Sequence, residues 1–109
     1  MLEFSRVTLA GPLWTVDEVK AHLRITDAAH DADVAQKLAA AQEGILAWLG
    51  PAADPSWTPT TAPLEVKNYV LLLTTHYYEH RGDELERDKA AIWATIAHGL
   101  TMYRDPAMG

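Results

Sequence analysis

Residues 15–50 read TVDEVKAHLRITDAAHDADVAQKLAAAQEGILAWLG, and this stretch decides the fold class. It opens with Thr15 and, three positions later, Glu18, which is the capping-box pattern of a helix N-terminus. Apolar residues then recur at helical spacing. The sequence therefore predicts a first helix from Val16 to Ile25.

A second, longer helical stripe follows in the same stretch. Its apolar residues step by three and four positions: Val34, Leu38, Ala41, Ile45 and Trp48. This periodicity predicts a helix from Asp31 to Leu49. Gly50 stands where a helix C-terminus favours a left-handed residue, and Pro51 prevents the helix from continuing.

Three aspartates lie where the first helix gives way to the second, at Asp27, Asp31 and Asp33. Closely spaced aspartates occur in calcium-binding loops, but this segment lacks the central glycine and the distal glutamate of such a loop. We interpret one aspartate as the cap of the second helix. The others then lie near the positive end of its dipole.

Two further helices are predicted downstream. The third runs from Leu64 to Arg81, with Pro63 in its first turn, and ends at Gly82. Its residues 69–73, YVLLL, cover most of the helix circumference, which indicates a central position. The fourth helix is expected over 84–103, where Gly99 is expected to weaken it and to bend or end it early.

The remaining segments carry no regular pattern. We expect one all-α domain over 1–109, a small bundle of four main helices. It comprises an irregular arm over 1–14, a helical core over 15–103 and a tail over 104–109. A loop with three prolines, residues 50–62, joins the second and third helices.

Composition narrows the possible functions. The chain has no cysteine, which excludes disulfides and thiolate metal sites. The net charge is −6 and the nine Lys and Arg residues are scattered, whereas a protein that grips nucleic acid normally gathers them in a patch. No apolar run approaches the roughly 20 residues of a membrane span, and no signal peptide is recognised. No nucleophile or phosphate-binding motif occurs, so we predict neither an enzyme nor a cofactor.

Two histidines in HYYEH, residues 76–80, suggest a metal site, because His76 and His80 share one helix face. A zinc protease places glutamate directly after the first histidine, but that position holds Tyr77, and Glu79 precedes the second histidine instead. A catalytic zinc also needs a third ligand, which nothing marks. A small metal-dependent enzyme is therefore the third choice, and we predict no metal.

The segment TVDEVKAHLRIT also resembles the opening helix of excisionase-like helix-turn-helix proteins. Those proteins continue with a tight turn and a basic recognition helix. This chain continues with TDAAHDADVAQKL, which would present aspartates to DNA phosphates. A DNA-binding regulator of this class stays as the alternative function.

A broader resemblance spans residues 12–104. The order of a proline, a capped helix with the core V-K-x-x-L-R-I and acidic residues before a long helix resembles the tailed-bacteriophage head–tail connector (adaptor) family. The segment HYYEHR matches an aromatic–Tyr–Glu–x–Arg pattern of that family, with Tyr78, Glu79 and Arg81 in place. The segment MYRDP is similar to a proline–Tyr–Arg ending, with Met102 where the proline would be. Related adaptors occur in gene transfer agents, which are phage-derived particles.

The resemblance implies a structural subunit and no catalysis. About a dozen copies would form a ring beneath the capsid portal protein and extend the DNA exit channel, a closed cyclic assembly. A stopper or tail-completion protein would bind the opposite face, and DNA would pass through the lumen without specific binding. The protein would be assembled in the bacterial cytoplasm and reside at the head–tail interface of a virion or phage-like particle, with no membrane partner.

Two groups of residues are predicted to carry this role. A polar network would tie the first helix to the end of the third, and it consists of Arg24, Glu79 and Arg81. The predicted portal or subunit contacts are Trp14, Trp57, Leu100, Met102, Tyr103 and Arg104. The two tryptophans lie outside the clear apolar stripes, and tryptophan is enriched at interfaces.

Overall fold

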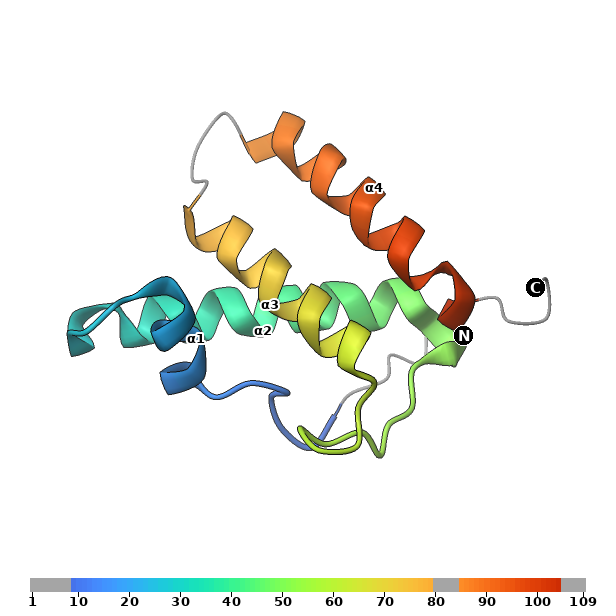
Figure 1. Cartoon of the computed structure of the whole chain (residues 1–109), viewed down its shortest axis with the longest axis horizontal. Coiled ribbons are helices and arrows are strands. Elements are labelled where there is room, and N and C mark those ends of the chain that lie inside the picture. The colour runs from blue at the N-terminus through green and yellow to red at the C-terminus, as the bar shows by residue number, and fades with distance from the viewer. Residues whose placement is uncertain (1–8, 80–84, 105–109) are drawn as a thin grey trace, which may run out of the picture.

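The computed structural model describes residues 9–79 and 85–104, with side chains described for 9–79 and 90–101. In these parts the chain is all-α with no strand, as predicted. Figure 1 shows four helices in chain order, α1 (Val16–Leu23), α2 (Asp31–Leu49), α3 (Leu64–Glu79) and α4 (Leu85–Arg104). Two short 3₁₀ turns, η1 (Ala28–His30) and η2 (Gly50–Ala52), flank α2.

The long helix α2 organises the bundle. It contacts α1, α3 and α4, whereas α3 contacts α2 and α4. In Figure 1, α3 crosses α2 and α4 runs beside α3 in the opposite direction. The sequence predicted a central third helix, yet α2 is the helix that meets all the others. One face of α3 stays open, since Leu64 is 65% exposed and Leu72 is 38% exposed.

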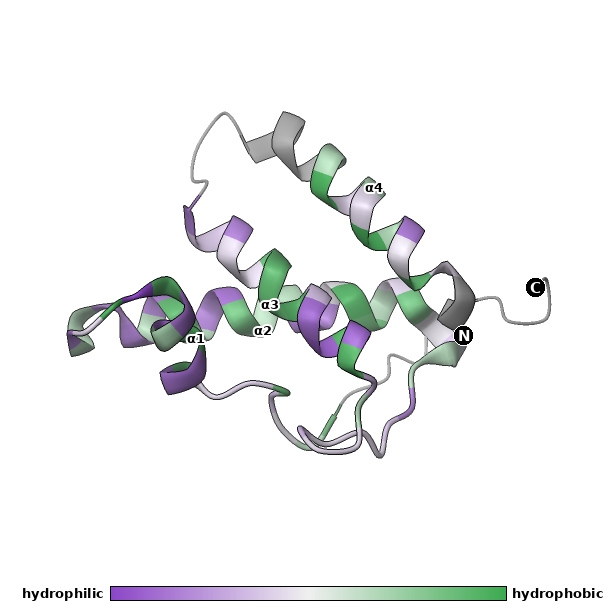
Figure 2. Cartoon of the chain, viewed as in Figure 1, coloured by the Kyte–Doolittle hydropathy of each residue, from purple (hydrophilic) through white to green (hydrophobic). Residues whose placement is uncertain are grey.

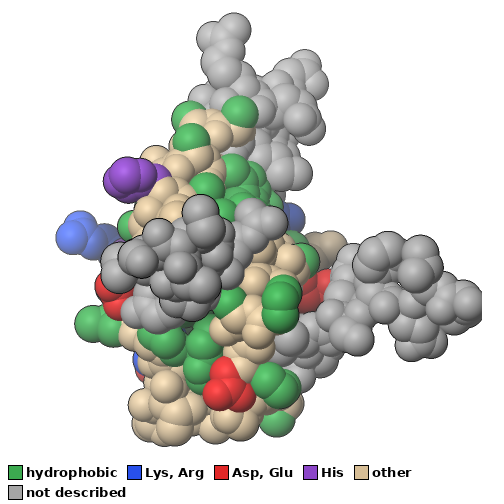
Figure 3. All heavy atoms as spheres, turned by 90° about the vertical axis from the view of Figure 1, so that its right-hand side faces the viewer, with side chains coloured by type: hydrophobic (Ala, Val, Ile, Leu, Met, Phe, Trp, Pro, Cys, Tyr) green, Lys and Arg blue, Asp and Glu red, His purple; other side chains and the backbone are tan. Residues whose placement is uncertain are grey.

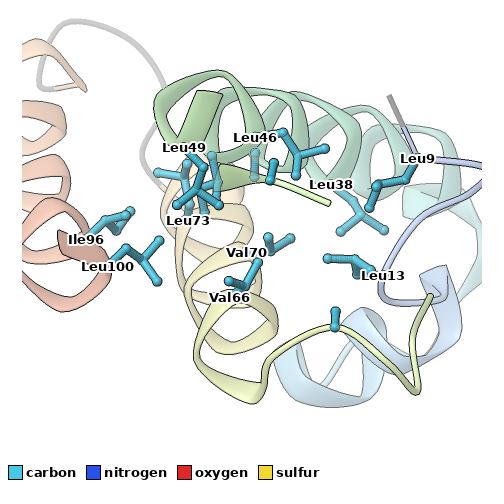
Figure 4. Close-up of a cluster of buried hydrophobic side chains, with 14 of the residues drawn as sticks. Leu9, Leu13, Leu38, Leu46, Leu49, Val66, Val70, Leu73, Ile96 and Leu100 are labelled. Atoms are coloured by element: carbon cyan, nitrogen blue, oxygen red, sulfur yellow. The ribbon is translucent and has the colours of Figure 1, made fainter. Parts of the chain in front are cut away.

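The core is a single cluster of aliphatic side chains drawn from every helix and from the arm. Figure 4 shows Leu49 of α2 beside Leu73 of α3, and Leu38 of α2 beside two arm residues. Those arm residues are Leu9, which is 7% exposed, and Leu13, which is fully buried. Figure 2 shows hydrophobic residues spaced along the helices, with hydrophilic residues between them. No described helix is long and apolar enough to cross a lipid bilayer.

The start of α1 is as predicted and its end differs. Thr15 Oγ1 accepts from the Glu18 N–H at 3.0 Å, and the Thr15 N–H donates to Glu18 Oε1 at 2.8 Å, which completes the capping box. The helix ends at Leu23 rather than Ile25 because Arg24 adopts a left-handed conformation with φ 62°. Its N–H still bonds to the Ala21 carbonyl, so the turn is closed despite the absence of glycine.

The aspartates serve two different helices. The N-cap of α2 is His30, without a side-chain capping bond, so the prediction that an aspartate caps α2 was wrong. Asp27 instead caps η1 by accepting from the Ala29 N–H at 3.0 Å. Asp31 and Asp33 lie in the first turn of α2, where the helix dipole favours negative charge, and each pairs with a lysine.

Short-range polar contacts order the proline-rich loop. Asp54 Oδ1 accepts from the Ser56 N–H and from the Ser56 hydroxyl, at 2.9 and 2.7 Å. Thr58 and Thr61 bond to each other around the second half of the loop. The loop also contributes buried Ala53 and Ala62 and the half-buried Trp57 to the core. It is therefore a packed part of the domain.

The ends of α3 and α4 deviate slightly from expectation. Pro63 precedes the first helical residue Leu64, and its carbonyl accepts from the Lys67 N–H at 3.1 Å. The described part of α3 ends at Glu79, and the predicted limits Arg81, Gly82 and Glu84 lie outside the described residues. Helix α4 continues to Arg104, one residue beyond the predicted end at 103, so Gly99 does not end it early.

Candidate functional site

A glutamine of α2 fixes the arm to the bundle. The Leu13 N–H donates to Gln42 Oε1 at 2.8 Å, and Gln42 Nε2 donates to the Gly11 carbonyl at 3.2 Å. One side chain thus satisfies a donor and an acceptor of the extended backbone, as a neighbouring strand would. The arm therefore leaves α1 along a defined path on α2.

Trp14 connects this arm to α3. Its indole Nε1 donates to the Lys67 carbonyl at 2.7 Å, and Lys67 Nζ lies 4.5 Å from the centroid of the same ring. The first contact is a hydrogen bond to backbone and the second a cation–π contact, and each holds the half-buried indole against the first turn of α3. Trp14 consequently has a structural role within the subunit.

The C-terminal end of α3 meets the turn between α1 and α2. The Tyr78 hydroxyl is 2.9 Å from His30 Nδ1, and the two rings pack edge-on with centroids 6.0 Å apart. Beside them, Lys20 of α1 pairs with Asp31 of α2 at 2.6 Å. That hydrogen bond raises the pKa of Lys20 above its ordinary value. The ends of three helices are thus joined by polar side chains.

Two residues of HYYEH that the metal hypothesis concerned, His76 and Glu79, lie in different surroundings. His76 is 9% exposed and lies in the interior of the bundle, whereas Glu79 is exposed at the end of α3. His80 lies outside the described residues. Within the described parts, no three His, Asp or Glu side chains gather closely enough to hold a metal ion.

A groove of about 440 Å³ separates the arm from α2. The arm and α1 contribute Leu9, Pro12 and Val16 to its wall, and α2 contributes an opposing row that includes Ala39 and Leu46. Glu43 is the charged residue among the described lining side chains. The groove is therefore a mostly apolar channel that begins where the described arm begins.

Comparison with protein families identifies this architecture. A family described as phage gp6-like head-tail connector protein matches residues 14–100. The chain belongs to this connector family. The matched region starts at Trp14 and includes all of α1, α2 and α3 and most of α4. Comparisons with curated proteins and with solved structures gave no match.

Membership confirms the resemblance noted in the sequence and gives the chain a structural role as a phage head–tail connector. The residues that join its helices can then be interpreted as the framework of a connector subunit. Arg24 closes α1 and is exposed, and Glu79 closes the described part of α3. Arg81 lies outside the described residues, so the network of these three residues stays a prediction.

The six predicted contact residues lie in different settings. Trp14 and Trp57 are half-buried against the core, and Leu100 is fully buried beside Ile96. Met102, Tyr103 and Arg104 form the end of α4, and their side chains lie outside the described set. Leu100 therefore packs α4 into the core, and the portal contact of the residues after it stays a prediction.

Sequence reasoning missed Gln42, Lys67 and His30. One of them had a local signal, because Gln42 lies four residues after Leu38 and four before Leu46. A polar side chain between buried positions on one helical stripe needs a polar partner. The other two act through contacts distant in sequence, and nothing in their immediate neighbours indicates these.

Proposed function

We propose that this connector is the subunit of a ring of about a dozen copies, a closed cyclic assembly that binds beneath the portal of a phage or gene transfer agent. The ring extends the channel through which DNA leaves the head. The observation that carries this proposal is the family match, which runs from Trp14 to Leu100. The function is structural, with no catalytic step and no cofactor.

Ring closure requires two different surfaces on each subunit that fit one another. The described residues offer two open helix faces. On α3, Leu64 and Leu72 project from the bundle, eight residues apart on one side of the helix. On α2, a face of small exposed residues lies away from the core: Ala32, Ala35, Ala39, Ala40 and Ala47. Large side chains on one face and small ones on another support contact between neighbouring copies.

The charge of the subunit supports passage of DNA without tight binding. The chain carries a net charge of −6, and like charge repels phosphates within a channel. Figure 3 shows one face on which the basic side chains of the described residues are isolated from one another. A strong grip on DNA would need several of them together.

We place the portal contact at the end of α4. Leu100 is fully buried, and α4 continues past it to Arg104. In this proposal Met102, Tyr103 and Arg104, at the end of the helix, contact the portal, and Trp57 and Trp14 line subunit contacts. The opposite end of the ring receives a stopper or tail-completion protein. This arrangement locates the protein at the head–tail interface of the particle, after assembly in the bacterial cytoplasm.

The network of Arg24, Glu79 and Arg81 forms part of the same proposal. The Tyr78–His30 contact brings the end of α3 to the turn that follows α1, which is the region where Arg24 lies. A guanidinium from either side of Glu79 would add charge-assisted bonds to that junction. The network would hold the helix ends at a fixed angle in the assembled ring.

Electron microscopy of the connector mixed with its portal tests the proposal. We expect an additional ring of density beneath the portal, with a copy number that native mass spectrometry can count. A chain ending after Thr101 keeps the buried Leu100 and should lose portal docking while its circular dichroism spectrum stays helical. The matched control is His98→Ala on the exposed face of α4, which should dock normally. A folded protein that adds no ring to its portal would overturn the proposal.

A further inference from the structure

The groove between the arm and α2 has the character of a binding channel for an extended apolar segment. Its volume is about 440 Å³, and its described walls are mainly aliphatic. On the α2 side the small side chains of Ala35, Ala39 and Ala47 leave room above the helix. An empty groove of this kind exposes apolar side chains to water, so covering it with other apolar side chains is favourable.

The described chain begins at this groove. Leu9 is both the first described residue and one of the groove-lining residues, and it is 7% exposed. Gln42 holds the next part of the arm to α2 through the Gly11 carbonyl and the Leu13 N–H. The position and the direction of the chain are therefore fixed where residues 1–8 join it.

The residues that precede Leu9 have a matching chemistry. They read MLEFSRVT, and their apolar side chains include Leu2, Phe4 and Val7. The two charged residues of this segment, Glu3 and Arg6, have opposite signs, so the match to the groove rests on the apolar side chains. Aliphatic and aromatic side chains suit the alanine and leucine walls of the groove.

Length also agrees. Twelve residues of helix separate Ala35 from Ala47, which corresponds to about 18 Å along α2. Eight extended residues span roughly 26 Å, so a segment that starts at Leu9 reaches either end of the groove. Tethering raises the effective concentration of such a segment into the millimolar range, which favours it over a free partner or a second copy.

We propose that residues 1–8 of the same chain occupy the groove beside α2, with Leu2, Phe4 and Val7 as apolar anchors. Residues 1–8 then cover the outer side of α2 in the isolated subunit. This segment precedes the region that matches the connector family, which starts at Trp14. The proposal concerns the isolated subunit, and a neighbouring copy that contacts this face of α2 in a ring would displace the segment.

Designed disulfides test this proposal directly, because the chain contains no cysteine of its own. Ser5→Cys is combined with Ala47→Cys at one end of the groove and, separately, with Ala35→Cys at the other. The control pair combines Ser5→Cys with Ala94→Cys on the exposed side of α4. Oxidation is followed at low micromolar protein on non-reducing gels, which separate cross-linked monomers from dimers.

We expect an intramolecular disulfide for at least one groove pair, formed about tenfold or more faster than in the control pair, as a local concentration advantage requires. Adding Phe4→Asp should reduce the groove-pair rate to that of the control, with an unchanged circular dichroism spectrum. Equal rates in all pairs would overturn the proposal. Disulfides found only between chains would also overturn it, because a second copy would then occupy the groove.

Discussion

The ring of Tyr69 in α3 fills the space that a side chain at Gly99 in α4 would need. A Cβ built at Gly99 meets Tyr69 Cε2 at 2.7 Å and lies closer still to the phenol carbon and oxygen. The glycine costs helix propensity but lets the two antiparallel helices approach with a tyrosine between them. This contact explains why α4 carries a glycine that its helical pattern does not need.

Replacing Gly99 with Ala should therefore destabilise the protein. The methyl group displaces the Tyr69 ring, and overpacking of this kind costs about 1–3 kcal/mol, partly offset by about 1 kcal/mol of helix propensity. We expect a net loss of about 1 kcal/mol or more in the free energy of unfolding, measured by urea denaturation.

The matched control for this prediction is Gly44→Ala in α2, which gains the same propensity. Its Cβ would lie 3.3 Å from Trp93 Cζ2, a tight contact that a small shift relieves. We expect this variant to be close to wild type in stability. Adding Tyr69→Leu to Gly99→Ala should recover part of the loss. A Gly99→Ala variant as stable as the wild type would show that the helices are less closely packed than the structure indicates.

Trp14→Phe should weaken the attachment of the arm to α3. The change removes the donor that bonds to the Lys67 carbonyl at 2.7 Å and keeps an aromatic ring beneath the Lys67 ammonium. A lost hydrogen bond costs about 0.5–1.5 kcal/mol, and a weaker cation–π contact adds to this. Lys67→Met removes only the cation and keeps the hydrogen bond to the residue-67 carbonyl. We therefore expect it to cost less than Trp14→Phe, and the difference reports the hydrogen bond. Equal losses in both variants would contradict this division.

Much of this fold could be predicted from the sequence where local pattern and local chemistry agree. The limits of α2, Asp31 and Leu49, follow from a regular stripe and a Gly-Pro stop, and the structure confirms both. The end of α1 was misplaced because Arg24 adopts a left-handed conformation that usually favours glycine. No residue type at that position indicated the turn.

The contacts that join the helices were harder to predict, because they link residues distant in the chain. Tyr78 and His30 are 48 positions apart, and Trp14 and Lys67 are 53 apart. Helical periodicity indicates on which side of its helix Tyr78 lies. It does not indicate which side chain from elsewhere in the chain contacts Tyr78. Spacing rules therefore identified HYYEH as notable, while its partner became visible only in the folded chain.

Arg24→Gly tests whether the Arg24 side chain contributes to the proposed network. A left-handed conformation, φ 62°, costs a non-glycine residue about 1 kcal/mol, so glycine alone should raise the free energy of unfolding by about 0.5–1 kcal/mol. Arg24→Ala keeps the backbone strain and removes the guanidinium. If the network holds, Arg24→Ala is less stable than the wild type and Arg24→Gly gains less than expected. Thermal unfolding of both variants separates these contributions.

Acid should weaken the proline-rich loop through Asp54. Bonds from the Ser56 backbone N–H and hydroxyl lower the pKa of Asp54 below its usual 3.8. The carboxylate therefore stabilises the folded state above that pH, and its contribution disappears as the pH falls through the lowered value. Asp54→Asn should reduce the melting temperature at neutral pH, with a difference that shrinks below pH 3.8. A difference that is constant with pH would contradict this role, and Ser56→Ala provides a partial control.

A double-mutant cycle on Tyr78 and His30 tests the junction between α3 and the α1–α2 turn. The Tyr78 hydroxyl lies 2.9 Å from His30 Nδ1, and the two groups share a hydrogen bond. Tyr78→Phe keeps the ring and removes that bond, so it should cost about 1 kcal/mol of unfolding free energy. Combined with His30→Ala, the losses should fall short of additivity by about 0.5–1.5 kcal/mol, as expected for contacting residues. The exposed His22→Ala should instead add fully to Tyr78→Phe, and full additivity with His30→Ala would mean that the two side chains are not coupled.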